Sequence, residues 1–257
     1  MTAKLYQPIQ ELSDTSIVHA GISMRKGGFS KAPYASFNLA FHVGDNPTVV
    51  SQNQRLFSSQ TKIKKLRYCQ QVHSDVVCHA DSVPFSTWIK ENLNVNPMTG
   101  DALISNRTGE TLGIFTADCV PIFILDTATP AIGIAHAGWR GTIARIAAKT
   151  ITAMNTTFGS HTKNCRIYLG ASIQKCCYTV STELVNQFTD NFGNDVKIED
   201  RLCLHTANIK QLCDIGIQPE SIFTSPYCTS CNTDLFYSHR AEGGQTGRML
   251  SFIQLIH

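Results

Sequence analysis

Short apolar runs, each closed by polar, proline or glycine residues, dominate the middle of the chain. Runs of four to eight residues that are rich in β-branched and aromatic side chains are typical of β-strands. We therefore predict a series of neighbouring buried strands between residues 66 and 138. Their sequences are LRYCQQVH (66–73), DVVCHA (75–80), DALIS (101–105), LGIFTAD (112–118), PIFILDT (121–127) and AIGIAHAG (131–138).

Two helices are predicted on either side of these strands. One lies within residues 44–60, where Asp45 or Asn46 can cap the first turn and Pro47 can occupy it. After Gly141, apolar residues recur at steps of three and four, which is typical of an amphipathic helix that packs on a sheet. These apolar positions are Ile143, Ile146, Ala147, Ile151, Met154 and Phe158.

The rest of the chain continues this mixture of strands and helices. No repeat, charge block or low-complexity linker divides the sequence, so we expect one α+β domain over residues 1–257. A glycine-containing loop at 26–38 could line a site. The further elements are strands at 16–24, 165–170 and 248–256, and helices at 181–192, with Ser181 as a cap, and at 205–215.

Charge and hydropathy narrow the class of partner. The chain has 22 Lys and Arg against 19 Asp and Glu, a net charge of +3, which is too small a bias for a nucleic-acid surface. The start of the chain has no secretory pattern, and no apolar run approaches the ~20 residues that span a bilayer. We therefore expect a cytoplasmic protein that acts on a small molecule, with no nucleic-acid or membrane partner.

The chain contains 10 cysteines, and the absence of an export signal favours reduced thiols over disulfides. Cys228 and Cys231 form a C-x-x-C pair. The sequence offers no second pair of this kind to complete a four-cysteine zinc site, so a structural or incidental origin is favoured over a functional one.

Three potential metal ligands, His73, Cys119 and His136, lie at the ends of predicted strands, where a sheet presents side chains to a cleft. They are far apart along the chain, so folding must bring them together. Two imidazoles and one thiolate suit zinc and leave a fourth tetrahedral position for water or substrate, as in a catalytic site. Asp118, beside the cysteine, could orient one of the ligands.

These residues also have interpretations without a metal. Isolated histidines are usually hydrogen-bonded in the core, and a lone cysteine is usually a buried thiol. Alternatively, Cys119 is a nucleophile and His136 its base, in hydrolysis or deamidation. The residues alone leave these alternatives open.

Eight sequence blocks, in order along nearly the whole chain, carry a family resemblance. They are GGFS (27–30), SFNLAFHVGDNP (36–47), QVHSD (71–75), DALIS (101–105), TADCVP (116–121), HAGWRG (136–141), LGASIQKCCYTV (169–180) and SHRAEGGQTGR (238–248). Together they resemble the laccase-domain family, also called the YfiH-like or peptidoglycan-editing factor family and often described as multicopper polyphenol oxidases. The chain departs from the family at GDNP, where a second Asp is common, and at SHRAEG, where two basic residues often adjoin.

The resemblance implies that His73, Cys119 and His136 are zinc ligands. It also implies a purine nucleoside phosphorylase, which splits adenosine, inosine or guanosine with phosphate. Phosphorolysis of methylthioadenosine and deamination of adenosine are associated with the family as well. The implied fold is an α/β sandwich with mixed sheets flanked by helices, similar to the catalytic domain of cytotoxic necrotizing toxins.

Phosphorolysis needs an anion site beside the ribose. Arg140 is the preferred catalytic cation, because it lies four residues after His136 and directly before the predicted long helix, whose N-terminus also favours an anion. The other candidate substrate contacts are Arg25, Arg240 and Arg248 for the anion, Gly28 and Ser30 for hydrogen bonds to it, and Asn38 for a ribose hydroxyl or a base edge.

Copper chemistry and binding without turnover are further alternatives. Cu²⁺ outcompetes Zn²⁺ at most nitrogen and sulfur sites, so slow copper-dependent oxidation of phenols is a secondary expectation. The 9 histidines contain no H-x-H pair, which disfavours the histidine-rich copper sites that reduce oxygen. A metal-free Cys-His amidase, including one that edits peptidoglycan precursors, and a module that binds zinc or nucleoside without catalysis also stay open.

Overall fold

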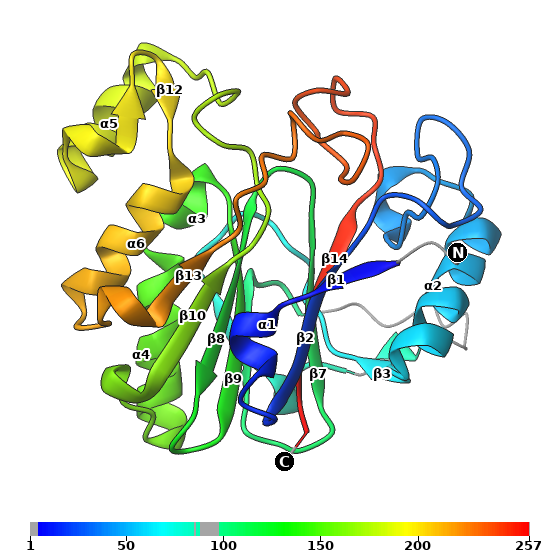
Figure 1. Ribbon diagram of the computed structural model, residues 1–257, viewed down its shortest axis with the longest axis horizontal. Coiled ribbons are helices and arrows are strands. Elements are labelled where there is room, and N and C mark those ends of the chain that lie inside the picture. The colour runs from blue at the N-terminus through cyan, green and yellow to red at the C-terminus, as the bar shows by residue number, and fades with distance from the viewer. Residues whose placement is uncertain (1–4, 85, 88–97, 257) are drawn as a thin grey trace.

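Two β-sheets pack face to face in the computed structural model, which describes residues 5–84, 86–87 and 98–256 (Figure 1). The larger sheet contains, in spatial order, β13 (Ile222–Thr224), β10 (Cys165–Leu169), β8 (Val120–Asp126), β9 (Ala131–Ala137), β6 (Ala102–Ser105) and β4 (Val77–His79). The smaller sheet contains β1 (Tyr6–Pro8), β2 (Val18–Ser23), β14 (Met249–Leu255) and β7 (Thr111–Thr116). Two short ribbons pair β3 (Lys65–Leu66) with β5 (Ser86–Thr87) and β11 (Lys197–Ile198) with β12 (Arg201–Leu202).

The larger sheet is mixed, because β4 runs parallel to β6 and β13 runs parallel to β10, while its other pairs are antiparallel. Its central strands are buried on both faces. In β8, Ile122 and Ile124 pack against helices, while Phe123 and Leu125 pack against the smaller sheet. A strand that is covered on both sides has no face for polar residues, which explains an apolar run without alternation.

Helices cover both outer faces of the paired sheets (Figure 1). The larger sheet carries α4 (Ile146–Phe158) and α6 (Leu204–Asp214), with α5 (Thr182–Phe192) beside them, and the smaller sheet carries α2 (Pro47–Thr61). This arrangement confirms the α/β sandwich with mixed sheets. None of the helices in the described part of the chain has the length and hydrophobicity of a membrane-spanning segment. The remaining helices are α1 (Gln10–Ser13), α3 (Trp139–Ile143) and 3₁₀ turns at Phe41–Val43, Ala80–Ser82, Thr162–Asn164, Asn194–Val196 and Pro219–Ser221.

Side-chain caps start two of the predicted helices. The Asn46 side chain accepts a hydrogen bond from the Thr48 amide at 2.9 Å, with Pro47 in the first turn. Ser181 likewise accepts a hydrogen bond from the Leu184 amide. Both caps, and the helices that they begin, confirm the prediction. The structure also confirms the predicted strands at 16–24, 75–80, 101–105, 112–118, 121–127, 131–138, 165–170 and 248–256, and the helix at 205–215, each with slightly different ends.

The amphipathic helix predicted after Gly141 is confirmed as α4, which packs on the larger sheet, but it starts later than predicted. The chain forms α3 and then α4, and the two are separated at Arg145, whose φ of +60° lies in the left-handed region. The side chain of Arg145 pairs with Asp214 of α6 at 2.9 Å. Apolar residues on both helices keep the same periodicity, so the sequence pattern did not reveal the break.

The strand predicted at 66–73 is also largely wrong. Regular pairing stops at Leu66, and Arg67 and Gln70 form only isolated bridges. Beyond them, the backbone amides of His73 and Ser74 bond to the carboxylate of Asp101 instead of to a neighbouring strand. At His73, the first candidate ligand, hydrogen bonds to the buried carboxylate of Asp101 therefore replace β-pairing.

His205 on α6 generates a prediction about stability and pH. It is buried, with Nε2 3.0 Å from the Ser172 hydroxyl oxygen and 3.1 Å from the Gly170 carbonyl oxygen. Burial lowers its pKa to about 4, against 6.5 in an unfolded chain. The folded state therefore favours neutral His205. The contribution of neutral His205 to the free energy of unfolding is complete above pH 6.5. As the pH falls towards 4, up to ~3 kcal/mol of this free energy is lost.

Urea unfolding at a series of pH values between 7 and about 4.5 measures this contribution. The unfolding free energy of the wild type should fall more steeply over this range than that of His205→Gln, which retains a polar side chain that does not titrate. Parallel pH profiles for the two proteins would contradict the assignment.

Candidate metal centre and substrate cavity

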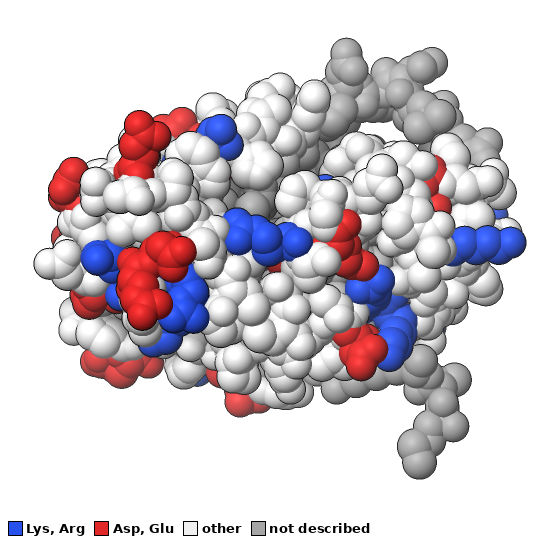
Figure 2. All heavy atoms as spheres, turned by 90° about the horizontal axis from the view of Figure 1, so that it is seen from above, with Lys and Arg blue, Asp and Glu red and all other residues white. Residues whose placement is uncertain are grey.

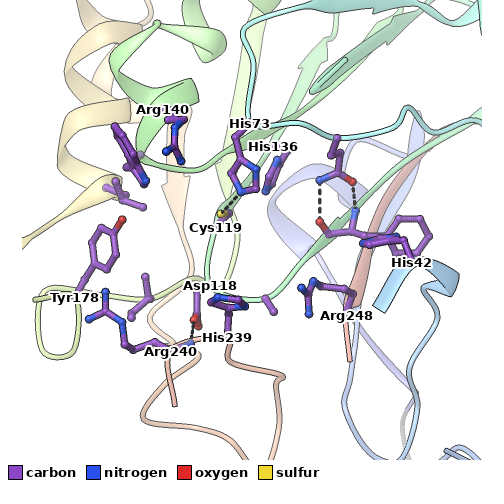
Figure 3. A pocket seen from close by; sticks show the side chains of 16 residues that line it. His42, His73, Asp118, Cys119, His136, Arg140, Tyr178, His239, Arg240 and Arg248 are labelled. Carbon is purple, nitrogen blue, oxygen red and sulfur yellow. Dashed lines mark hydrogen bonds between the residues drawn. The ribbon is translucent and has the colours of Figure 1, made fainter. Parts of the chain in front are cut away.

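The three candidate ligands meet at one end of the sandwich, although they come from separate segments. His73 lies in the loop before β4, Cys119 in the loop between β7 and β8, and His136 near the end of β9. Their ligand atoms all lie within 4.8 Å of one another. Cys119 Sγ is 3.8 Å from His73 Nε2, and the two imidazole rings are 4.8 Å apart between centroids (Figure 3).

The geometry of this group fits a transition metal. Zinc bonds of ~2.3 Å to sulfur and ~2.0 Å to nitrogen, at a tetrahedral angle, place such donors ~3.6 Å apart. The observed distance between Cys119 Sγ and His73 Nε2 is close to this value. Gly138 leaves the space that these side chains need, because a Cβ atom there would lie 2.9 Å from both Cys119 Sγ and His73 Cδ2. The group can therefore hold a metal ion between two imidazoles and a thiolate.

Asp101 orients both histidines of the group. Its Oδ1 is 2.8 Å from Nδ1 of His136 and accepts a hydrogen bond from the His73 amide at 3.0 Å, while Oδ2 accepts from the amide and hydroxyl of Ser74. The bond at Nδ1 leaves Nε2 of His136 to face the ion. His73 itself has a φ of +61°, a strained conformation that these amide bonds hold in place.

The electrostatics of the group favour an anionic sulfur. Burial raises the pKa of Cys119, but His136 and His73 outweigh burial and lower that pKa to about 6. Burial also opposes the charge on His136, whereas Cys119 and Asp101 raise its pKa to about 9. Burial raises the pKa of Asp101, but hydrogen bonds from His136 and Ser74 exceed this effect and lower the pKa to about 2. Without a metal, a proton on His136 balances the thiolate, and a metal ion would take that place.

Asp118 does not orient a metal ligand, contrary to the sequence prediction. Its Oδ1 accepts a hydrogen bond from the Thr229 hydroxyl at 2.6 Å, and its Oδ2 accepts from the Arg240 amide at 2.7 Å. Asp118 therefore fixes the backbone of Arg240. The role expected of Asp118, which was to orient a candidate metal ligand, belongs to Asp101. The sequence signal for Asp101 was its place directly before the buried run ALIS, but only the fold shows which histidines it meets.

A cavity of about 410 Å³ opens beside the metal group. This volume lies within the range of small-molecule sites. The loops that form it lie at the upper end of the sandwich in Figure 1, where β7 ends, β8 begins and β9 ends. Its wall combines apolar, aromatic and cationic side chains: His42, Gln71, His73, Phe115, Ala117, Asp118, Cys119, His136, Trp139, Arg140, Ile173, Tyr178, Leu204, His239, Arg240 and Arg248.

Three arginines contribute positive charge to this cavity. Arg140 and Arg240 lie on one side of the metal group, and Arg248 lies on the other side (Figure 3). Arg140 stacks on the Trp139 ring at 4.0 Å, whereas Arg240 and Arg248 donate hydrogen bonds to backbone carbonyls. Among the described residues, none of the three forms an ion pair with a carboxylate. Seen from above, the surface of the molecule shows basic and acidic side chains interspersed (Figure 2).

Four predicted substrate contacts do not line this cavity. Arg25 pairs with Glu242 at 2.6 Å, and Ser30 donates a hydrogen bond to Asp45. Gly28 is closely packed, because a Cβ atom there would lie 2.4 Å from the side-chain oxygen of Asn53. These three residues hold the loop at 26–38 together.

Asn38, the fourth of these residues, acts through the backbone of Arg248. Its Oδ1 accepts a hydrogen bond from the Arg248 amide at 3.0 Å, and its Nδ2 donates to Asp45. Asn38 therefore helps to place an arginine of the cavity without lining the cavity itself.

Sequence reasoning assigned no role to several residues of the wall. His42, Tyr178 and His239 lie within sequence blocks that carried the family resemblance. Burial, with smaller effects of Arg248 and His136, lowers the pKa of His42, so its ring is neutral at neutral pH. Burial raises the pKa of Tyr178 to about 12, so its hydroxyl stays protonated.

Comparisons with known proteins agree in sequence and in structure. A family model described as multi-copper polyphenol oxidoreductase laccase matches residues 19–256. "Purine nucleoside phosphorylase YlmD" of Geobacillus stearothermophilus is 33% identical over 244 residues, which cover 91% of this chain and 89% of that protein. "Purine nucleoside phosphorylase YfiH" of Escherichia coli (strain K12) is 32% identical over 249 residues, with 93% and 94% covered. The crystal structure of YlmD from Geobacillus stearothermophilus matches with a TM-score of 0.87 and 30% identity, and covers 100% of this chain and 98% of that chain.

The two aspartates give a paired prediction for metal binding. Asp101→Asn should weaken the metal affinity of the His73, Cys119 and His136 group by about 10- to 100-fold, because the histidines lose their orienting charge. Asp118→Asn is the matched control and should leave this affinity nearly unchanged. Competition with a chromophoric chelator measures both, and Cys119→Ser identifies the metal equivalent that belongs to this group. Equal losses in the two aspartate variants would contradict the role of Asp101.

Proposed function

The chain belongs to the family of multi-copper polyphenol oxidoreductase laccases, whose curated relatives named above are purine nucleoside phosphorylases, and on this basis we propose that it splits purine nucleosides with phosphate. The proposed substrates are adenosine, inosine, guanosine and methylthioadenosine, and the proposed metal is zinc at His73, Cys119 and His136. One observation carries this proposal: three arginines, none of which pairs with a carboxylate in the described part of the chain, share a cavity of about 410 Å³ with a group that can hold a metal.

Phosphorolysis sets clear demands on the cavity. A phosphate oxygen forms a bond to C1′ of the ribose while the bond from C1′ to N9 of the purine breaks. The bonding electrons leave with the purine, which takes up a proton, and ribose 1-phosphate is the other product. The site must therefore hold a phosphate dianion against the ribose, an apolar base beside it, and a hydrogen-bond donor near the departing base.

The residues of the wall meet these demands. Arg140, Arg240 and Arg248 provide planar guanidinium groups, which bind phosphate with paired hydrogen bonds. Phe115 and Leu204 offer apolar surface for the purine. The Tyr178 hydroxyl, the His42 ring and the His239 ring are available for hydrogen bonds to the base or the ribose. The proposed substrates differ at C2 and C6 of the purine and at the 5′ carbon, and they share the ribose C1′ and the purine ring that these groups would contact.

A zinc ion bound at this group supplies a positive charge that stabilises negative charge on the reacting groups. The chain's own contribution is to keep the donor atoms in place. Asp101 bonds to Nδ1 of His136, so Nε2 would be the ring atom that binds the ion, and Gly138 leaves room for Cys119 Sγ. The same group supports deamination of adenosine as the second proposed activity.

Oxidation of phenols is proposed only as a side activity of copper-loaded protein. A His₂Cys set can accept copper, which binds such donors more tightly than zinc. Reduction of oxygen by multicopper oxidases needs additional histidine-rich sites. Over the described part of the chain, the groups of three or more metal-binding side chains are the His73, Cys119 and His136 group and a group of four cysteines.

A metal-free Cys-His hydrolase is the alternative that the geometry also favours. Cys119 lies beside the imidazoles, and His136 in turn bonds to Asp101, which is the order of nucleophile, base and orienting group. Such an enzyme would cleave an amide, including one in a peptidoglycan precursor. Its activity would survive removal of the metal, which separates it from the main proposal.

Zinc-defined protein incubated with adenosine and phosphate should form adenine and ribose 1-phosphate, and complete zinc removal should abolish both. Liquid chromatography of the base, with an enzymatic assay for the sugar phosphate, measures the products. Inosine formed without phosphate reports deamination separately. Undiminished product after zinc removal would contradict the zinc mechanism, and no ribose 1-phosphate under any metal condition would contradict phosphorolysis.

Arg140→Met should raise the KM for phosphate by about 10- to 100-fold, the loss expected for a charge-assisted hydrogen bond, while the KM for nucleoside changes less. Arg107→Met is the control, because Arg107 is exposed and pairs with Asp81 at 2.7 Å, outside the cavity. Steady-state kinetics with phosphate varied at saturating nucleoside measures the effect. An unchanged KM for phosphate would exclude Arg140 from the anion site.

A further inference from the structure

Four cysteines from two distant loops converge next to the cavity. Cys176 and Cys177 lie in the loop that follows β10, and Cys228 and Cys231 lie in the loop that follows β13. Cys231 Sγ is 3.5 Å from Cys176 Sγ and 3.3 Å from Cys177 Sγ, and all four sulfur atoms lie within 4.8 Å of one another. The expectation that Cys228 and Cys231 lack a second pair is therefore wrong, because folding supplies the adjacent pair.

We propose that these four sulfur atoms bind a structural zinc ion, separate from the metal at His73, Cys119 and His136. A tetrahedral site with Zn–S bonds of ~2.3 Å separates neighbouring sulfur atoms by ~3.8 Å. The two separations at Cys231, 3.5 Å and 3.3 Å, are slightly shorter than this value, and all four sulfur atoms lie within 4.8 Å of one another. Four protein ligands close the coordination sphere, which is typical of a structural site rather than a catalytic one.

Backbone donors around Cys228 favour a metal-bound thiolate. Cys228 is buried, and its sulfur accepts a hydrogen bond from the Gln174 amide at 3.4 Å and another from the Cys231 amide. Amide donors stabilise negative charge on sulfur. Four sulfur atoms at this spacing can all carry negative charge only if a cation balances them, and zinc supplies that charge.

A disulfide accounts less well for this arrangement. It would join two sulfur atoms at ~2.05 Å and leave two thiols without a partner. Cys176 and Cys177 are both close to Cys231, so neither is singled out as its partner. All four sulfur atoms lie within 4.8 Å of one another, which is close enough for one ion to bind them together.

The proposed ion would stabilise the wall of the cavity that contains Tyr178 and Arg240. Tyr178 directly follows Cys177, and the Arg240 guanidinium donates hydrogen bonds to the carbonyls of Cys177 and Thr179. On the other loop, Thr229 donates to Asp118, which also binds the Arg240 amide. The zinc ion therefore links the two segments that hold Arg240, without contacting the cavity itself.

Zinc content of the full-length protein, purified under reducing and metal-defined conditions, tests the proposal. Cys231→Ser should contain one zinc equivalent fewer than the wild type, and Cys119→Ser should lose a different equivalent, so the double variant loses both. Cys231→His should retain the ion, because histidine can replace a cysteine ligand. Cys213→Ser is the control for a cysteine outside both groups.

Cobalt substitution adds a readout that a misfolded variant would not reproduce. The thiolate-to-cobalt absorption of Cys119→Ser should be that of a four-thiolate site, and Cys231→Ser should keep only the weaker absorption of a one-thiolate site. Thermal unfolding checks that each variant is folded. An unchanged zinc content in Cys231→Ser, iron in place of zinc, or a disulfide among the four cysteines in the freshly purified wild type would overturn the proposal. These readouts do not require phosphorylase activity, so failure of the proposed function would not affect them.

Discussion

The carboxylate of Asp101 is the constraint on which the site depends. It is fully buried, and a buried carboxylate is tolerated only when its oxygen atoms are hydrogen-bonded. The His73 segment provides backbone donors, and His136 provides a ring nitrogen. Satisfying this one group therefore fixes the turn of the loop at His73 and orients His136. The positions of two ligands follow from a single electrostatic requirement in the core.

The antiparallel connections of the sandwich bring the other parts of the site to the same end. Cys119 lies in the tight connection between β7 and β8, His136 near the end of β9, and Arg248 directly before β14. Arg240 depends on a longer chain of contacts, through Asp118 and Thr229, to the loop of Cys228 and Cys231. The cysteine group and the candidate metal group of His73, Cys119 and His136 thus lie at the same cavity wall. A rigid core places the ligands, and bonds between loops place the arginines.

Much of the fold was predictable from local physics. Strands such as β8 and β9 are buried on both faces, so their apolar runs were recognisable without alternation, and Asn46 and Pro47 marked the start of α2. The break between α3 and α4 was not predictable, because a left-handed residue at Arg145 leaves the apolar periodicity intact. The candidate metal ligands were selected through the family resemblance, since their spacing alone proves nothing. Asp101 and the pair of Cys176 with Cys177 were missed because their partners are distant in sequence and only folding shows the contacts.

The central claim is that His73, Cys119 and His136 hold one metal ion beside the cavity. Anomalous diffraction at the zinc edge, from crystals of metal-defined protein, tests it most directly. We expect an anomalous peak ~2.3 Å from Cys119 Sγ and ~2.0 Å from one ring nitrogen of each histidine, with the remaining position facing the cavity. Fully zinc-loaded crystals with no peak there, or with an ion that contacts only one of these side chains, would contradict the account.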